Sequence, residues 1–86
     1  MEDKVKELLK GKLDELKLIV DSVLLEKENN NLFLRICLDG DKLDLDNIVA
    51  ATNIINPIID KYDLIDESYI LEVYGKSKGS VYDEKK

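Results

Sequence analysis

The sequence predicts an α+β domain, a two-layer α/β sandwich in which two helices cover one face of a three-stranded sheet. Two regions repeat apolar residues at intervals of three or four, as amphipathic helices do. Three other stretches are β-branched or alternate between apolar and polar residues, as strands do. These segments follow one another in the order α-β-β-α-β. Placing both helices on one side of the sheet is the simplest way to bury their apolar stripes.

The first helix is predicted from an apolar stripe made of Val5, Leu8, Leu9, Leu13 and Leu16. Glu2 and Asp3 lie at its start, where the helix dipole favours negative charge. Gly11 lies inside the pattern, at a cost of about 1 kcal/mol relative to alanine. We expect this glycine to be tolerated on the helix surface without a functional role.

A hairpin follows the first helix. Residues 19–25 are apolar and β-branched, residues 26–31 are polar with three consecutive asparagines, and alternation resumes at Leu32. The sequence therefore predicts two strands joined by a mobile loop. In the second strand, alternate residues from Leu32 to Leu38 share an apolar face, while Phe33, Arg35 and Cys37 share the other. One face of the sheet should be apolar and the other mixed.

The second helix is predicted from the stripe Ile48, Ala51, Thr52, Ile55, Ile59 and Tyr62. A turn over residues 39–42 precedes it, and the carboxylate of Asp44 or Asp46 can accept hydrogen bonds from its first free N–H groups. Pro57 cannot continue the hydrogen-bond ladder and disfavours helical angles at the preceding residue. We expect a kink or break near Ile55.

The third strand is predicted over residues 69–74, with Tyr69, Leu71 and Val73 on one face. Ile70, Glu72 and Tyr74 then lie on the other face. Residues 75–86 are polar, and we expect them to form a flexible tail after a single domain over residues 1–74.

Charge and length limit the function. The 86 residues make one small domain with a formal net charge of −6 and a single arginine. Nucleic-acid binding over the whole surface is disfavoured, because its affinity comes from lysines and arginines that neutralise phosphates. A basic protein is the more natural electrostatic complement.

The chain lacks the usual parts of an enzyme site. It has one cysteine, Cys37, and no histidine, so one chain cannot form a disulfide, a Cys/His zinc site or a Cys-His nucleophile. No apolar run approaches the roughly 18 residues that span a bilayer, and the N-terminus lacks the apolar core of a signal peptide. We expect a cytoplasmic protein that is not an enzyme and has no cofactor, metal, small-molecule substrate or membrane contact.

Three specific functional interpretations, a calcium site, a phosphate loop and a KH-type RNA-binding loop, are less well supported than ordinary structural explanations. The acidic residues over 39–46 have the wrong register for an EF-hand, and a turn followed by a helix cap explains them. The segment 75–79, Gly-Lys-Ser-Lys-Gly, has glycines too closely spaced for a P-loop. It also lacks the two helices that flank the G-x-x-G loop of an RNA-binding KH domain.

Five segments in one order resemble a known family. Residues 34–39 (Leu-Arg-Ile-Cys-Leu-Asp), 43–47 (Leu-Asp-Leu-Asp-Asn), 56–60 (Asn-Pro-Ile-Ile-Asp) and 69–73 (Tyr-Ile-Leu-Glu-Val) match a family pattern in letters and spacing, and residues 18–21 match more weakly. The pattern is L-R-V-Y-I-D, V-T-L-D-D, S-P-L-L-D and Y-T-L-E-V, with E-L-V-D before it. The chain thus resembles the N-terminal domain of the ribosome maturation factor RimP.

The resemblance implies a partner and a role. It implies association with the immature small (30S) ribosomal subunit, through basic ribosomal protein, rRNA or both, and assistance of its assembly without catalysis. The family continues into a serine-serine-proline-glycine element and a small β-barrel domain. We expect that barrel to be absent from this sequence, so functions that need it do not carry over.

The mixed face of the sheet is the candidate contact surface. It carries Phe33, Arg35, Glu72 and Tyr74, and an arginine among aromatic residues is typical of interface anchors. The ordinary alternative is that Arg35 and Glu72 pair across strands while the two rings shield the sheet. A second functional hypothesis is a protein-interaction or dimerisation module that forms a weak homodimer through this face or an edge strand.

Overall fold

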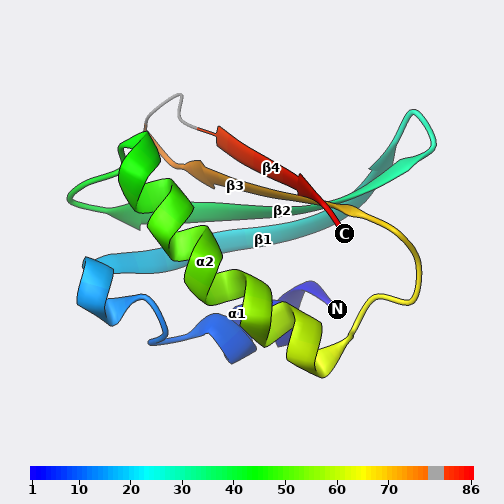
Figure 1. The fold of residues 1–86 in the computed structure, drawn as a ribbon, viewed down its shortest axis with the longest axis horizontal. Coiled ribbons are helices and arrows are strands. Elements are labelled where there is room, and N and C mark those ends of the chain that lie inside the picture. Colours follow the sequence, from blue (N-terminus) through cyan, green and yellow to red (C-terminus); the bar gives the residue numbers. More distant parts are fainter. Residues whose placement is uncertain (78–80) are drawn as a thin grey trace.

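A computed structural model of the chain describes residues 1–77 and 81–86. It contains a twisted sheet with both α-helices in front of it (Figure 1). In chain order, the elements are α1 (Glu2–Leu9), the 3₁₀ turn η1 (Asp14–Leu16), β1 (Leu18–Glu28), β2 (Asn31–Gly40), α2 (Leu45–Tyr62), β3 (Ile70–Gly75) and β4 (Val81–Lys85).

The described residues form a four-stranded mixed sheet in the order β1-β2-β3-β4. The β1/β2 and β3/β4 pairs are antiparallel, whereas β2 and β3 are parallel. A parallel pair needs a long connection, and α2 supplies it by crossing over the sheet between them.

The prediction of a three-stranded sheet was wrong because residues assigned to a polar tail include β4. This strand is short and mostly charged, as edge strands often are, so it shows no apolar run in the sequence. Its backbone pairs with β3, and Tyr82 packs against the core. Residues 78–80 of the expected tail, which include part of the segment compared with phosphate loops, lie outside the described residues.

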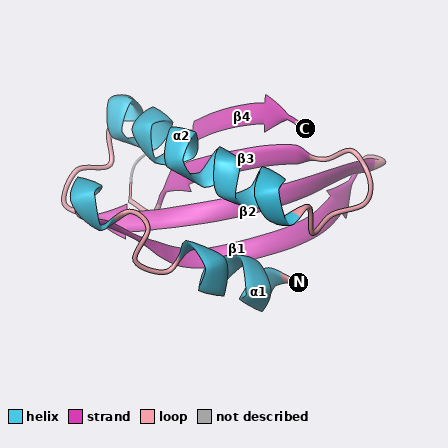
Figure 2. Cartoon of the chain, turned by 60° about the horizontal axis from the view of Figure 1, so that its bottom comes forward, coloured by secondary structure: helices cyan, strands magenta, loops and turns pink. Residues whose placement is uncertain are grey.

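One hydrophobic core lies between the sheet and the helices, and Figure 2 shows both helices on that side in a second view. The alternation predicted for the strands is confirmed. Leu34, Ile36 and Leu38 of β2 are fully buried, as are Leu71 and Val73 of β3. The α-β-β-α part of the predicted order and the single covered face hold, with β4 added after β3.

The hairpin between β1 and β2 is tighter than predicted. The expected loop over residues 26–31 is mostly strand, and only Asn29 and Asn30 form the turn. Both have positive φ, 51° and 68°, as a type I′ hairpin turn requires, and asparagine tolerates that conformation. The three asparagines are therefore a turn signal rather than a sign of a mobile loop.

The first helix is shorter than its apolar stripe suggested. It ends at Leu9, and Gly11 takes a φ of +75°, which favours glycine over residues with a side chain. The prediction that Gly11 lies inside a helix was therefore wrong. Leu13 still reaches the core after the turn, which explains why its spacing fitted the helical pattern.

The second helix is continuous through Pro57, so the predicted break near Ile55 was wrong. Pro57 is exposed, and Ile55 and Ile59 are buried on either side of it, so core packing holds the helix across the missing hydrogen bond. The predicted cap is confirmed, because the Asp44 side chain accepts a hydrogen bond from the Asn47 N–H at 3.0 Å. Tyr62 departs from the predicted core stripe and is 48% exposed.

Candidate functional site

The face of the sheet that the helices leave uncovered is called the open sheet face. Residues that pair directly across strands share a face, so the register defines its members from the predicted residues outward. They are Ile19, Ser22, Leu24, Glu26 and Glu28 of β1, Asn31, Phe33, Arg35, Cys37 and Asp39 of β2, Ile70, Glu72 and Tyr74 of β3, and Val81, Asp83 and Lys85 of β4.

The four predicted contact residues lie together on the two central strands. Arg35 is directly opposite Glu72; Phe33 lies two residues before Arg35, and Tyr74 lies two residues after Glu72. The parallel register of β2 and β3 produces this grouping, although the two segments are far apart in the sequence.

Arg35 is the centre of a network of ion pairs. Its Nε donates to Glu72 Oε2 at 2.5 Å, its Nη1 donates to Glu26 Oε1, and its Nη2 donates to Glu28 Oε2 at 3.1 Å. The guanidinium carbon lies 4.3 Å from the centroid of the Phe33 ring, a cation–π contact. The hydrogen bond with Glu72 is the largest cause that holds the pKa of Arg35 above its ordinary value.

Sequence reasoning missed two of these three carboxylates. Glu26 and Glu28 were assigned to a polar loop, whereas they are strand residues that reach Arg35. The Asn29-Asn30 turn was the available signal, because a two-residue hairpin fixes which residues pair across it. That register places Glu26 opposite Phe33 and Glu28 opposite Asn31.

The open sheet face is acidic. Among the described residues, its four strands contribute five carboxylates, on Glu26, Glu28, Asp39, Glu72 and Asp83, and two cations, on Arg35 and Lys85. Arg35 is already satisfied by three of the carboxylates, so it presents little unpaired positive charge. This arrangement suits a partner that brings its own cations.

Apolar side chains lie among these charges. Leu24 on β1 and Val81 on β4 are each 44% exposed, and Ile70 and Tyr74 between them are half-buried. A surface with exposed aliphatic and aromatic groups framed by carboxylates can bind the apolar part of a basic segment while pairing with its charges.

The comparison with protein families matches the model described as RimP N-terminal domain over residues 8–75. This range runs from α1 to the end of β3 and covers most of the chain.

The chain belongs to the RimP N-terminal domain family.

The match confirms the resemblance found in the sequence motifs and suggests a role in ribosome maturation. It also contains β2 and β3, so the four predicted contact residues lie within the RimP-type region.

Cys37 of this RimP N-terminal domain is a buried residue of the open sheet face, 6% exposed. Burial is the largest cause that raises the pKa of its thiol, so less thiolate is present near neutral pH than for a free cysteine. Tyr74 lies opposite Cys37, and burial raises the pKa of its phenol as well. Both groups therefore act as neutral packing residues at this position.

Residues 1–77 and 81–86 contain no group of three or more histidine, cysteine, aspartate or glutamate side chains placed to hold a metal ion. The aspartates over residues 39–46 are accounted for in part by local contacts, in which Asp39 accepts from the Gly40 N–H and Asp44 caps α2. None of the helices in the described part of the chain is long and apolar enough to cross a membrane.

Proposed function

We propose that the chain is a non-catalytic ribosome maturation factor that assists assembly of the small (30S) ribosomal subunit in the cytoplasm. It acts by binding a basic ribosomal protein on the open sheet face. The observation that carries the proposal is the Arg35 network, in which the single arginine is held by three carboxylates and the face around it stays acidic. Family membership supports the ribosomal setting.

Charge favours a basic protein over rRNA at this face. Phosphates would be repelled by Glu26, Glu28 and Asp83, whereas the lysines and arginines of a ribosomal protein would be attracted. Such attraction also speeds the encounter between the partners, and salt screens it. We therefore expect binding to weaken as the salt concentration rises.

The proposed contact residues have separate roles. Phe33 and Tyr74 supply aromatic surface, and Glu72 holds Arg35 over the Phe33 ring. Arg35 is a positioning residue here, because its hydrogen bonds hold Glu26 and Glu28 at the surface in a fixed arrangement. The exposed Leu24 adds an aliphatic contact next to this group.

A non-catalytic role agrees with the chemistry of the chain. It has no histidine to act as a general base near neutral pH, and the pKa of its one thiol is raised by burial. We propose no cofactor, metal or small-molecule substrate for this surface.

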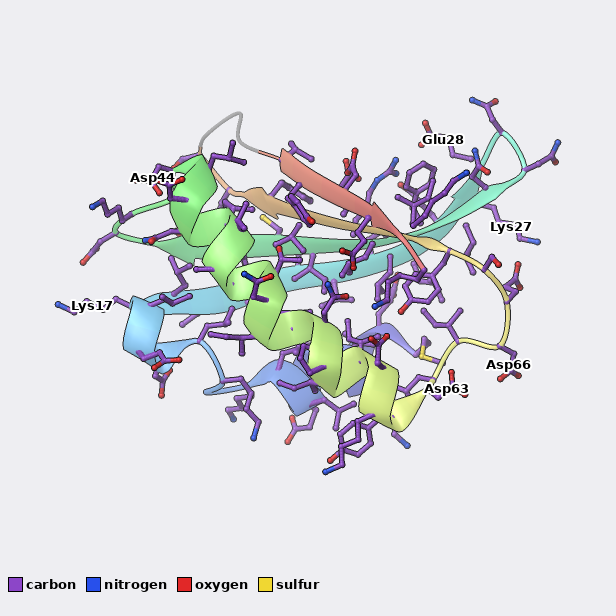
Figure 3. All side chains as sticks on the ribbon, viewed as in Figure 1. Lys17, Lys27, Glu28, Asp44, Asp63 and Asp66 are labelled. Carbon is purple, nitrogen blue, oxygen red and sulfur yellow. The ribbon has the colours of Figure 1, made fainter. Side chains whose placement is uncertain are left out.

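The test is co-sedimentation with immature and mature small ribosomal subunits at low salt, comparing two variants with the same change in net charge. The first carries Glu28→Lys and Asp83→Lys, which reverse two carboxylates of the open sheet face. The control carries Glu15→Lys and Asp66→Lys, which reverse two exposed carboxylates elsewhere. Figure 3 shows Glu28 near the hairpin tip of β1 and β2 and Asp66 in the separate loop after α2.

We expect the unaltered chain and the control to bind the immature particle preferentially, and the open-face variant to lose most of this binding. Equal loss in both variants would mean that overall charge, rather than this face, determines association. Absence of binding by the unaltered chain would refute the proposal.

The same face could instead join two copies of the chain, as the second sequence hypothesis holds. Its exposed Leu24 and Val81 favour self-association, whereas a two-fold contact would bring two acidic surfaces together. Light scattering distinguishes the two functions, because a dimer whose apparent mass falls on Leu24→Ala would support the self-association role.

A further inference from the structure

A second surface lies on the helix side of the molecule, where α1 and the C-terminal half of α2 form a groove of about 480 Å³. We call it the helix groove. Its lining includes Leu8, Lys10, Lys12, Ile58, Lys61 and Tyr62.

Tyr62 is the first feature of the helix groove that the fold does not explain. The residue falls on the apolar stripe of α2, yet it is 48% exposed at the C-terminal end of the helix. The ammonium group of Lys61 lies 5.7 Å from the centroid of its ring. An exposed aromatic ring beside a cation offers a flat surface for another π system.

The second feature is the convergence of three lysines. Lys10 and Lys12 follow α1, whereas Lys61 belongs to the last turn of α2, and folding brings them to one groove. Glu7 contributes the one carboxylate of the lining.

These lysines differ from Arg35 and Lys86. Within residues 1–77 and 81–86, no carboxylate lies within 4.0 Å of the ammonium group of Lys10, Lys12 or Lys61. By contrast, Arg35 and Lys86 are each paired with carboxylates. The helix groove is therefore locally positive on a chain whose net charge is −6.

We propose that the helix groove binds single-stranded RNA, with phosphates contacting Lys10, Lys12 and Lys61 and one base stacking on Tyr62. An acidic protein segment would also be attracted by the lysines, but it would not need an exposed aromatic ring beside them. Single-stranded nucleic acid uses both features, because lysines follow its backbone and aromatic rings stack its bases. The inference goes beyond the proposed function and rests on the groove alone.

The three lysines predict that RNA affinity depends weakly but measurably on the salt concentration. For single strands, the logarithm of the binding constant falls with the logarithm of salt concentration by roughly 0.7 per neutralised phosphate, so three lysines give a slope of about −2. This corresponds to binding that weakens by about tenfold to twentyfold between roughly 50 and 200 mM salt.

The test measures fluorescence anisotropy of a labelled oligoadenylate of about ten nucleotides, a length within the usual range for a single-strand site. Tyr62→Ala should weaken binding about fivefold or more with the salt slope unchanged, and Tyr62→Phe should restore it because phenylalanine keeps the ring. The variant with Lys10, Lys12 and Lys61 all changed to alanine should lose most of the binding and most of the slope.

The matched control changes Lys27, Lys42 and Lys85 to alanine, which removes the same charge away from the groove, and it should alter affinity by less than about twofold. No oligonucleotide binding, or equal weakening in both triple variants, would overturn the proposal. Binding of an oligoglutamate peptide that depends on the three lysines and is unaffected by Tyr62→Ala, with no RNA binding, would assign the groove to an acidic protein segment. This assay contains no ribosomal particle, so it can fail independently of the proposed function.

Discussion

The two faces of the sheet are built from alternate residues of the same strands, but they have different composition and surroundings. On the helix-covered face, Leu34, Ile36, Leu71 and Val73 are fully buried in one apolar core. On the open sheet face, their neighbours Arg35 and Glu72 form an ion pair and remain partly exposed. Adjacent positions in one strand can therefore be changed to test stability and partner binding separately.

The largest expected difference in stability is between alanine substitutions of two leucines that lie on opposite faces of the sheet. Leu34→Ala on the covered face should lower the free energy of unfolding by about 2 to 5 kcal/mol, because it removes a fully buried side chain and leaves a cavity. Leu24→Ala, at a position 44% exposed on the open sheet face, should cost less than about 1 kcal/mol. Urea unfolding followed by circular dichroism measures both values.

Similar losses for the two leucines would contradict this comparison. They would mean that Leu24 is buried in solution, as a dimer formed through the open sheet face requires. Repeating the measurement at several protein concentrations distinguishes a dimer, since its stability rises with concentration.

The faces of β2 and β3 could be predicted because side chains alternate strictly along a strand. Once Leu34 was assigned to the apolar face, Phe33 and Arg35 had to lie on the other. The end of α1 and the continuity of α2 through Pro57 were predicted wrongly. Both predictions used only the local conformational preferences of Gly11 and Pro57, without knowing which neighbouring residues pack in the core.

The candidate site was predicted in its centre but not at its margins. Local alternation placed Arg35 and Glu72 on the mixed face, and their pairing was one of two alternatives; the parallel register that sets them opposite each other is seen only in the structure. The positions of the Glu26 and Glu28 carboxylates depend on the hairpin register. The strand β4 depends on backbone pairing with β3, and its short charged sequence does not indicate a strand. The lysines of the helix groove converge only through tertiary packing, which no local pattern contains.

A smaller change in the free energy of unfolding is expected from the ionisation of Tyr69, which lies on the covered side and is 9% exposed. Burial is the first cause that raises the pKa of its phenol to about 12, with Asp60 and Asp63 adding to it. The phenol ionises near pH 10 in the unfolded chain, so the folded state keeps its proton longer and loses stability as the pH rises from about 10 through 12.

Tyr69→Phe removes this ionisation. Between about pH 9 and about pH 11, the stability of the unaltered chain should fall relative to the variant by roughly 1 to 1.5 kcal/mol. Absorbance titration near 295 nm should also lose its most alkaline phase in the variant. A variant that changes with pH as the unaltered chain does would show that solvent reaches the Tyr69 phenol.

The smallest expected change in stability is on the open sheet face, at Glu28, the most exposed carboxylate that pairs with Arg35. Glu28→Gln removes an ion pair whose carboxylate is 55% exposed, so it should change the free energy of unfolding by less than about 0.5 kcal/mol. Glu72→Gln, at a position whose side chain is 21% exposed and 2.5 Å from Arg35, should cost about 1 kcal/mol or more. The same urea unfolding experiments compare the two variants.

The difference in stability loss between Glu28→Gln and Glu72→Gln distinguishes two roles of carboxylates in the Arg35 network. If Glu28→Gln leaves stability unchanged but weakens co-sedimentation with immature subunits, Glu28 contributes to partner binding and Glu72 contributes to holding Arg35 in place. If Glu28→Gln destabilises the chain as much as Glu72→Gln, the three carboxylates act together as a structural unit. The acidic character of the open sheet face would then be a consequence of folding, and the exposed Leu24 and Val81 would become the better test of partner binding.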